Sequence, residues 1–347
     1  MRIAEPPRSL RLTIDREALA ENWRTLDTLS GDAATGAAVK ADAYGIGVDI
    51  AVPTLRDAGC RQFFLAHWSE VPAVLAHVEA DAVSILHGVR NAEEAAFAKG
   101  TGAVPVINSP RQAAIWRDAG GGTCHVMVDS GMNRLGMSLA DLGDPVVQSL
   151  QVDALMSHLA SADEDTAQNA DQLAVFRKAV PLLAAKRLSL SNSAGIALGA
   201  DFNIDLTRPG LALYGGIPHP ALRGKIRQVA FPQAAIIQTR DLSPGDKVGY
   251  NAKWIAERPT RAGTVSLGYA DGFMRLMGQG SALHFGEHEL PILGRVSMDM
   301  VVVDLGESGA GEGDFLDVPF DLPDLAARSG LSQYEILTGL GRRFERF

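Results

Sequence analysis

The chain has 347 residues, of which 46% are hydrophobic and 21% are charged. This length predicts roughly two domains, and the composition is typical of an ordinary globular protein rather than a disordered or fibrous one. The formal net charge of −9 and the lack of a basic run interleaved with aromatic residues argue against nucleic acid as a partner.

Cysteine usage and hydropathy limit the environment of the protein. Cys60 and Cys124 are too few for a disulfide framework or a cysteine metal site, so we expect two structural thiols, a reducing compartment and no bound metal. The first residues, MRIAEPPRSLRLTIDRE, carry prolines and charges where a secretion signal needs an apolar stretch. No run is long enough to cross a membrane. We therefore predict a cytoplasmic protein with no membrane partner.

Between residue 36 and about residue 215, short apolar runs alternate with longer amphipathic stretches, which predicts repeated strand–helix units. Eight such runs are enough to close a parallel barrel, so we predict an α/β fold that begins with a (β/α)8 barrel of the TIM type. No GxGxxG motif follows the first run, which argues against a dinucleotide-binding fold. The expected strands are GAAVK ending at Lys40, RQFFLA from Arg61, AVSILHG from Ala82, AVPVIN from Ala103, HVMVD ending at Asp129, ALMSHLA from Ala154, LSLSNS ending at Ser193 and RPGLALYG from Arg208.

After about Phe231 the pattern changes to strands separated by Gly/Pro turns, which predicts a mostly β C-terminal domain. We place the barrel domain at residues 1–230 and the β domain at residues 231–347; an early strand, LRLTI near residues 10–14, could belong to either. Two helices are expected near the C terminus. Asp321 is the predicted N-cap of the first, and Ser332 with Glu335 forms the capping box of the second.

A lysine stands at the end of the first expected strand. Active sites of such barrels gather at the C-terminal ends of the strands, so the Lys40 side chain is expected inside the barrel mouth. Desolvation lowers the pKa of a lysine and makes its amine a nucleophile toward an aldehyde. From position alone, the commoner alternative is a lysine that extends its ammonium into solvent.

The residues around Lys40 form a specific motif. VKADAYGIG, at residues 39–47, matches the lysine signature of the alanine racemase family nearly residue for residue. Further matches follow in order: VDSGMNRLG (128–136), SHLASAD (157–163), SNSAG (191–195), RPGLALYGG (208–216), GYADGF (268–273) and GRVSMD (294–299). The chain thus resembles alanine racemases over most of its length. The resemblance implies a barrel followed by a β domain and the interconversion of L- and D-alanine with pyridoxal 5′-phosphate.

The resemblance also implies a set of cofactor contacts. Lys40 would carry the cofactor covalently, and Arg208 would hydrogen-bond the pyridine nitrogen. A guanidinium keeps its proton near neutrality, so the ring would remain a weaker electron sink. His158 would pack against the ring, and Arg134 would contact the phenolic oxygen of the cofactor and the substrate carboxylate. The expected phosphate contacts are Tyr44, Asn192, Ser193, Gly210 and Leu211.

Racemisation requires an acid/base group on each face of the α-carbon. By resemblance, Lys40 acts on the D-face and Tyr269, in the β domain, acts on the L-face. Met298, through its backbone N–H, and Asp299 would close over the substrate carboxylate. In related enzymes these residues of the β domain serve the neighbouring subunit, which implies a head-to-tail homodimer with shared active sites. Taken alone, Tyr269 could equally be a buried structural tyrosine, and Met298 and Asp299 could belong to the edge of a strand.

Two positions depart from the family pattern. Met127 stands where the family often has a carbamylated lysine that supports the neighbouring Arg134, and Arg342 stands where some relatives carry a tyrosine that reaches the phosphate. A methionine forms no carbamate, so another group must support the arginine here.

Other functions remain as alternatives. A broad-specificity amino acid racemase or a basic amino acid decarboxylase of the same fold type would share the barrel and the lysine. Arg208 argues against the decarboxylase, which is expected to place an acidic group at the pyridine nitrogen. A non-catalytic pyridoxal-phosphate carrier is the alternative from another class, and the β domain with Tyr269 argues against it. Whether D-alanine is made for peptidoglycan or consumed is left open.

Overall fold

The computed structural model describes residues 6–347, which divide into two compact units. Arg16–Arg227 form the larger unit, and residues 6–15 join Gln228–Phe347 in the smaller one. No helix among the described residues is both long and apolar enough to span a bilayer.

The larger unit is built on a seven-stranded parallel sheet whose neighbouring strands follow chain order. The strands are β3 (Ala37–Ala38), β4 (Phe63–Leu65), β5 (Val83–Ile85), β6 (Val104–Ile107), β7 (Thr123–Met127), β8 (Gln151–Met156) and β9 (Arg187–Ser189). Each of the first seven expected runs contributes one of them. Strands β4, β5 and β6 are buried at every residue, as expected of parallel strands that are covered on both faces.

The eighth strand bridges the two ends of this row, but it lies before the run in which we expected it. It is β10 (Leu206–Thr207), which pairs in parallel with β2 (Ala34–Thr35), the short strand just before β3. On its other side, the Asp205 N–H donates to the Leu188 carbonyl at 3.1 Å and the Arg208 N–H donates to the Ser191 carbonyl at 2.9 Å.

The expected strand RPGLALYG was therefore wrong in position. Residues Leu211–Tyr214 form a 3₁₀ helix, η5, and all of them are buried. Pro209 lacks the backbone donor that a strand would need there. A fully buried apolar run has no polar face, so its hydrophobic pattern does not distinguish a strand from a short helix.

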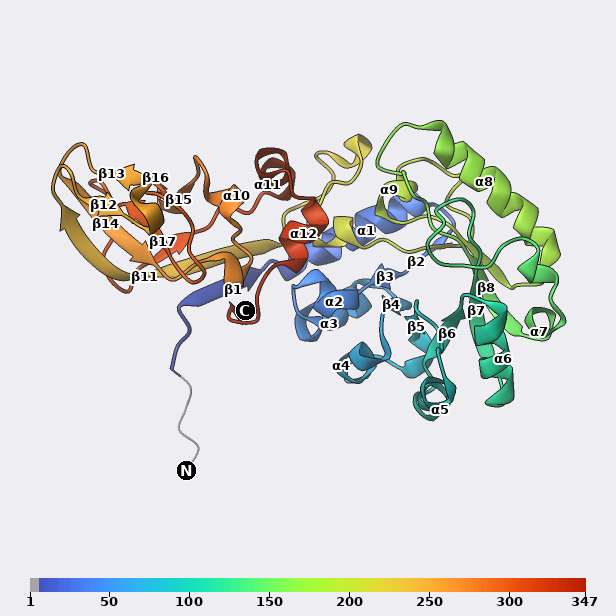
Figure 1. Ribbon diagram of the computed structural model, residues 1–347. Helices are drawn as coiled ribbons and strands as arrows, with labels where there is room; N and C mark the ends of the chain where they lie inside the picture. Colours follow the sequence, from blue (N-terminus) through green and yellow to red (C-terminus); the bar gives the residue numbers. More distant parts are fainter. Residues whose placement is uncertain (1–5) are drawn as a thin grey trace, which may run out of the picture. The chain divides into compact units, whose positions relative to one another are not determined.

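Helices lie around the outside of the barrel strands (Figure 1). They are α1 (Arg16–Ser30), α3 (Val48–Ala58), α4 (Val71–Leu75), α5 (Ala92–Thr101), α6 (Pro110–Asp118), α7 (Pro145–Gln148) and α8 (Ala167–Ala179), with α2 (Lys40–Tyr44) and α9 (Ser193–Ile196) directly after strands. Further 3₁₀ turns are η1 (Trp68–Glu70), η2 (Ala80–Ala82), η3 (Asp141–Gly143), η4 (Val180–Leu182) and η6 (Pro220–Leu222). Parallel strands joined in this way bring all their C-terminal ends to one mouth.

The smaller unit is mostly β, as predicted. Its long strand β11 (Ala230–Leu242) pairs antiparallel with β1 (Leu10–Ile14), β14 (Thr260–Val265) and β18 (Phe315–Asp317). The early strand LRLTI is β1, and it belongs to this unit through β11 and β19. The other elements are β12 (Lys247–Val248), η7 (Tyr250–Ala252), β13 (Trp254–Ile255), η8 (Tyr269–Asp271), α10 (Arg275–Gly278), β15 (Ala282–Phe285), β16 (His288–Pro291), β17 (Val301–Asp304), α11 (Leu322–Ser329), α12 (Gln333–Thr338) and β19 (Glu345–Arg346).

Both predicted helix caps near the C terminus are present. The Asp321 carboxylate accepts the Asp324 N–H at 2.8 Å and caps α11. The Ser332 hydroxyl accepts the Glu335 N–H at 3.2 Å, while the Glu335 carboxylate accepts the Ser332 N–H at 2.8 Å. This reciprocal pair is the expected capping box, and it satisfies donors that the first turn of α12 leaves unpaired.

Candidate active site

Lys40 lies directly after β3, at the barrel mouth. The preceding Val39 is fully buried, and Lys40 itself is half-buried. Burial lowers the pKa of Lys40; the charge of Arg134 lowers it further, Glu70 opposes the shift, and Arg208 adds a smaller lowering effect. A lowered pKa leaves a larger fraction of the side chain as the free amine, which is the form that attacks an aldehyde.

The backbone after Lys40 forms a left-handed turn that nothing in the sequence predicted. Residues 41–44 have φ angles between 53° and 57°. For residues other than glycine this conformation costs roughly 1–2 kcal/mol each, so the turn needs support from its surroundings. The Asp42 carboxylate accepts the Val48 N–H at 2.8 Å, and the Glu70 carboxylate accepts the Ala41 N–H at 2.5 Å.

Glu70 is a site residue that sequence reasoning missed. Its Oε2 accepts the N–H groups of Ala66 and His67 at 2.8 and 2.9 Å, while its Oε1 accepts the Ala41 N–H. One carboxylate therefore ties the end of β4 to the turn after Lys40. The only sequence signal was an acidic residue shortly after an expected strand, which is too common to single out.

Arg208 is buried at the barrel mouth, with 6% of its surface exposed. Its guanidinium donates to the Ser157 carbonyl at 2.6 Å and to the Ser189 hydroxyl. Burial lowers the pKa of Arg208 to about 10, so the side chain stays charged at neutral pH. These contacts fix the direction of the guanidinium on both sides.

His158 follows β8 and lies among the cations of the mouth. Burial lowers the pKa of His158 to about 3, and the charges of Arg208, Arg134 and Lys40 lower it as well. The imidazole is therefore neutral at physiological pH. Because all three cations act on this ring, the structure brings the four predicted residues together.

A polar cradle lies beside Lys40. The Ser193 hydroxyl accepts the Gly210 N–H at 2.8 Å and the Ala212 N–H at 3.2 Å. A Cβ added to Gly210 would lie 2.3 Å from the Tyr44 Oη, so the tyrosine hydroxyl lies against this backbone and a side chain at position 210 would displace it. Leu211 is buried next in the chain, with 1% exposed. Four of the expected phosphate contacts therefore converge.

The other expected phosphate contact, Asn192, is the N-cap of α9. Its side-chain oxygen accepts the Gly195 N–H at 2.8 Å. This bond engages the oxygen, so a contact with an anion would use the NH2 group of the same amide.

Arg134 is exposed in the loop that follows β7. The Asp129 carboxylate shapes this loop by accepting two backbone N–H groups at 2.8 and 2.9 Å, and Asn133 has a φ of 56°. Met127, in the position of the carbamylated lysine, is 5% exposed and packs near Gly136, whose added Cβ would lie 3.2 Å from the Met127 Cγ.

The predicted residues of the β domain meet each other within the smaller unit. Tyr269 begins η8 and is half-buried, and the Ala270 N–H donates to the Met298 carbonyl at 3.0 Å. A Cβ on Gly268 would lie 2.2 Å from the Met298 carbonyl oxygen and 2.5 Å from the Asp299 nitrogen. The turn that carries Tyr269 is thus in backbone contact with the SMD segment, residues 297–299.

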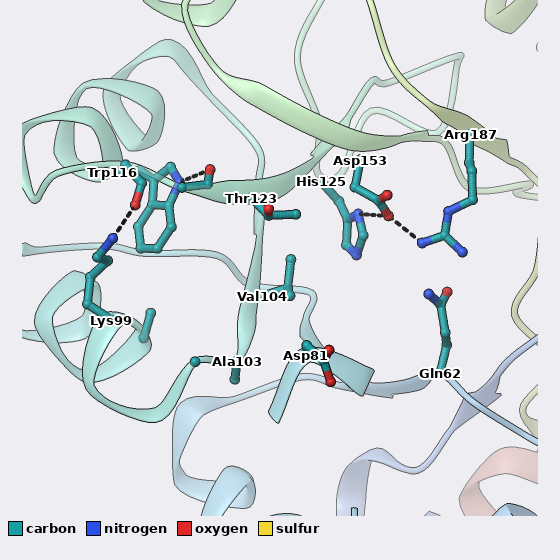
Figure 2. Close-up of a pocket in the computed structure, with 14 residues that line it drawn as sticks. Gln62, Asp81, Lys99, Ala103, Val104, Trp116, Thr123, His125, Asp153 and Arg187 are labelled. Atoms are coloured by element: carbon teal, nitrogen blue, oxygen red, sulfur yellow. Dashed lines mark hydrogen bonds and ion pairs between the residues drawn. The ribbon is translucent and has the colours of Figure 1, made fainter. Parts of the chain in front are cut away.

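A separate cavity of about 460 Å³ lies at the amino-terminal ends of the barrel strands (Figure 2). The Ser84 hydroxyl lies 3.0 Å from the Nε2 of His125. The Nδ1 of the same imidazole lies 3.6 Å from an Asp153 carboxylate oxygen, and Arg187 forms an ion pair with that carboxylate. This order of groups is that of a nucleophilic triad, but Ser84 is only 3% exposed and burial lowers the pKa of His125 to about 4. We read the group as a buried polar network, because barrel active sites lie at the opposite ends of the strands.

Comparison with known proteins identifies the family. Residues 14–218 match the model of the alanine racemase N-terminal domain, and residues 229–347 match the model of the alanine racemase C-terminal domain. The chain belongs to the alanine racemase family. The resemblance inferred from the motifs and the prediction of an enzyme of this family are confirmed.

Similar proteins of the family match nearly the whole chain. The catabolic alanine racemase of Agrobacterium fabrum strain C58 is 40% identical over 353 residues, which cover 96% of this chain and 91% of that protein. The biosynthetic alanine racemase of the same organism is 38% identical over 366 residues, with 97% and 93% covered. A crystal structure of alanine racemase from Bartonella henselae with covalently bound pyridoxal phosphate has a TM-score of 0.90 at 32% identity and covers 98% of this chain and 99% of that chain.

Proposed function

We propose that the protein interconverts L- and D-alanine with pyridoxal 5′-phosphate held by Lys40. The observation that carries the proposal is an amine with a lowered pKa at a barrel mouth, next to a cradle of hydroxyl and backbone groups. Alanine as the substrate is supported by the activity for which the similar proteins are named. A racemase of broader specificity is the alternative.

The described residues fit the cofactor. Tyr44, Ser193 and the backbone at Gly210 and Leu211 would bind its phosphate with neutral donors, and Asn192 would add its NH2 group. His158 would pack against the ring as a neutral imidazole. When bound, pyridoxal phosphate draws electron density from the α-carbon of an attached amino acid and so acidifies the α-proton.

Arg208 would set how strongly the cofactor draws electrons. With a pKa of about 10, its guanidinium keeps its proton at neutral pH, so it would donate a hydrogen bond to the ring nitrogen without protonating it. The bonds to Ser157 and Ser189 hold it in that orientation. A ring left unprotonated is a weaker electron sink, which would suppress transamination.

Two groups would move the α-proton. The Lys40 Nζ would remove or return it on the D-face, and the Tyr269 Oη would do so on the L-face. Arg134 would bind the substrate carboxylate with its planar pair of donors, helped by the Met298 N–H and by Asp299.

We further propose that the active sites are shared in a head-to-tail homodimer. Tyr269 belongs to the smaller unit, and large apolar side chains are exposed shortly after it in the chain and in and next to the SMD segment that its turn contacts. Met274 is 37% exposed, Leu276 56%, Met298 53% and Met300 42%. Methionine-rich apolar surface of this kind is typical of protein interfaces. We expect the enzyme to act in the cytoplasm, where it would either supply D-alanine for peptidoglycan or consume D-alanine in its breakdown.

Incubation of the purified holoprotein with L-alanine in deuterated water tests the proposal. We expect deuterium at the α-carbon and a loss of optical rotation to appear together. Release of carbon dioxide without D-alanine would contradict racemisation and favour a decarboxylase, while equal rates with several bulky amino acids would favour the broad-specificity alternative.

A further inference from the structure

Arg343 joins two carboxylates beside Tyr269. Its Nε lies 2.7 Å from the Asp271 Oδ1, and its Nη1 donates to the Asp299 Oδ1 at 2.8 Å. The Asp271 side chain is 1% exposed, whereas the Asp299 side chain is 49% exposed. One guanidinium therefore links a buried carboxylate to an accessible one.

Asp271 belongs to the turn that carries Tyr269. Its Oδ2 accepts the Gly268 N–H at 2.9 Å and closes the turn, which leaves its Oδ1 facing Arg343. Burial raises the pKa of Asp271, and the Gly268 N–H and Arg343 both oppose that shift. The arginine thus helps to keep this carboxylate ionised where it shapes η8.

Asp299 belongs to the SMD segment on the other side of the link. The backbones of the turn and the segment are joined by two hydrogen bonds, from the Tyr269 N–H to the Ser297 carbonyl at 3.1 Å and from the Ala270 N–H to the Met298 carbonyl at 3.0 Å. The salt bridge from Arg343 to Asp299 spans the same junction through side chains.

The stretch that carries Arg343 is also packed closely on the turn. A Cβ added to Gly272 would lie 2.3 Å from the Gly339 carbonyl oxygen, and one added to Gly341 would lie 3.1 Å from the Ala270 carbonyl oxygen. These contacts leave no room for side chains between the two backbones. The guanidinium consequently starts from a fixed position relative to η8.

We propose that Arg343 is a positioning residue that holds Tyr269 and the SMD segment in one relative geometry. It would fix the turn through Asp271 and the segment through Asp299. The two ion pairs leave from different nitrogens of a planar guanidinium, and a lysine ammonium would not reproduce that fork. The inference rests on the proposed roles of Tyr269, Met298 and Asp299.

Amide hydrogen exchange tests the clamp without reference to activity. In holoenzyme carrying Arg343→Lys, we expect exchange at residues 268–271 and 297–299 to be faster by about tenfold, as for the loss of one hydrogen bond to a charged group. Arg328→Gln is the matched control, because it removes a surface arginine paired with Asp324 at 2.8 Å in the same unit. Unchanged exchange in both segments of Arg343→Lys would overturn the proposal.

Kinetics separate positioning from a merely structural role. Arg343→Lys should raise the KM for alanine, lower kcat, and slow deuterium incorporation from L-alanine more than from D-alanine. A structural role alone would lower stability and leave the ratio of the two incorporation rates as in the wild type, and that result would refute the proposal.

A second variant covers the case in which Arg343→Lys does not fold. Arg343→Met combined with Asp271→Asn removes both charges of the Arg343–Asp271 pair and keeps an acceptor for the Gly268 N–H. We expect it to fold and to show the same change in the ratio of deuterium incorporation from L-alanine to that from D-alanine. An unchanged ratio in the folded double variant would count against the clamp.

Failure of the proposed function can be told apart from failure of this inference. If the wild type itself incorporated no deuterium from alanine, the proposed function would fail, while the exchange comparison would still decide whether Arg343 holds the two segments together.

Discussion

The Glu70 carboxylate accepts the Ala41 N–H at 2.5 Å and so holds the first residue of the left-handed turn that follows Lys40. The same negative charge opposes the lowering of the Lys40 pKa. One side chain therefore acts on both the backbone position and the basicity of the proposed nucleophile.

Glu70→Ala should destabilise the holoprotein by about 2 kcal/mol, because three backbone N–H groups lose a charged acceptor. In the protein without cofactor it should also lower the Lys40 pKa further, since the raising effect of the carboxylate is gone. Chemical unfolding measures the first effect. Glu93→Ala, at an exposed position of α5, is the control, and equal stability of the two variants would contradict the role of Glu70.

Gly210→Ala should weaken cofactor binding by about tenfold or more, because the new methyl group would displace the Tyr44 hydroxyl from the phosphate cradle. Equilibrium dialysis against pyridoxal phosphate provides the measurement. Gly100→Ala is the matched control, since an added Cβ there has no neighbour within 4 Å. The cradle assignment fails if both variants bind the cofactor as tightly as the wild type.

Tyr269→Phe should slow deuterium incorporation from L-alanine by about 100-fold, which is the ordinary contribution of a general acid/base group. Incorporation from D-alanine, where Lys40 acts, should persist. Mass spectrometry of each isomer incubated separately in deuterated water gives both rates. An equal loss from both isomers would refute the assignment of the two faces.

His158 should make the protein less stable as the pH falls. Its pKa is about 3 in the folded chain and near 6.5 when unfolded, so between these values the unfolded state binds the extra proton. The contribution of the neutral imidazole to the free energy of unfolding is therefore fully present above the unfolded pKa. It is lost as the pH falls below that value, at up to about 1.4 kcal/mol per pH unit. Unfolding of His158→Asn between about pH 6 and pH 4 should show a correspondingly shallower slope. A slope identical to that of the wild type would show that the imidazole is not held neutral.

Local and periodic features of the fold were predictable from the sequence. The capping box at Ser332 depends on residues three apart, and the buried strands stand out as apolar runs between longer amphipathic stretches. The eighth strand was misplaced because the buried run Leu211–Tyr214 has no polar face by which a strand could be distinguished from a helix. The motifs placed Lys40 and His158 at strand ends, as the structure does, whereas Arg208 was expected at the start of the eighth strand and instead follows β10.

The supporting contacts were not predictable, because they join residues far apart in the chain. Glu70 lies 29 residues from Ala41, and Arg343 lies 44 residues from Asp299. Neither has a neighbouring sequence pattern that marks its partner. The left-handed turn at 41–44 is equally hidden, since alanine and tyrosine rarely adopt that conformation and only the surrounding contacts select it.

Reduction of the purified holoprotein with borohydride, followed by peptide mass spectrometry, tests the central claim most directly. We predict a pyridoxyl group attached to the Lys40 peptide and to no other lysine. An unmodified Lys40 peptide, or a pyridoxyl group at a different lysine, would contradict the account.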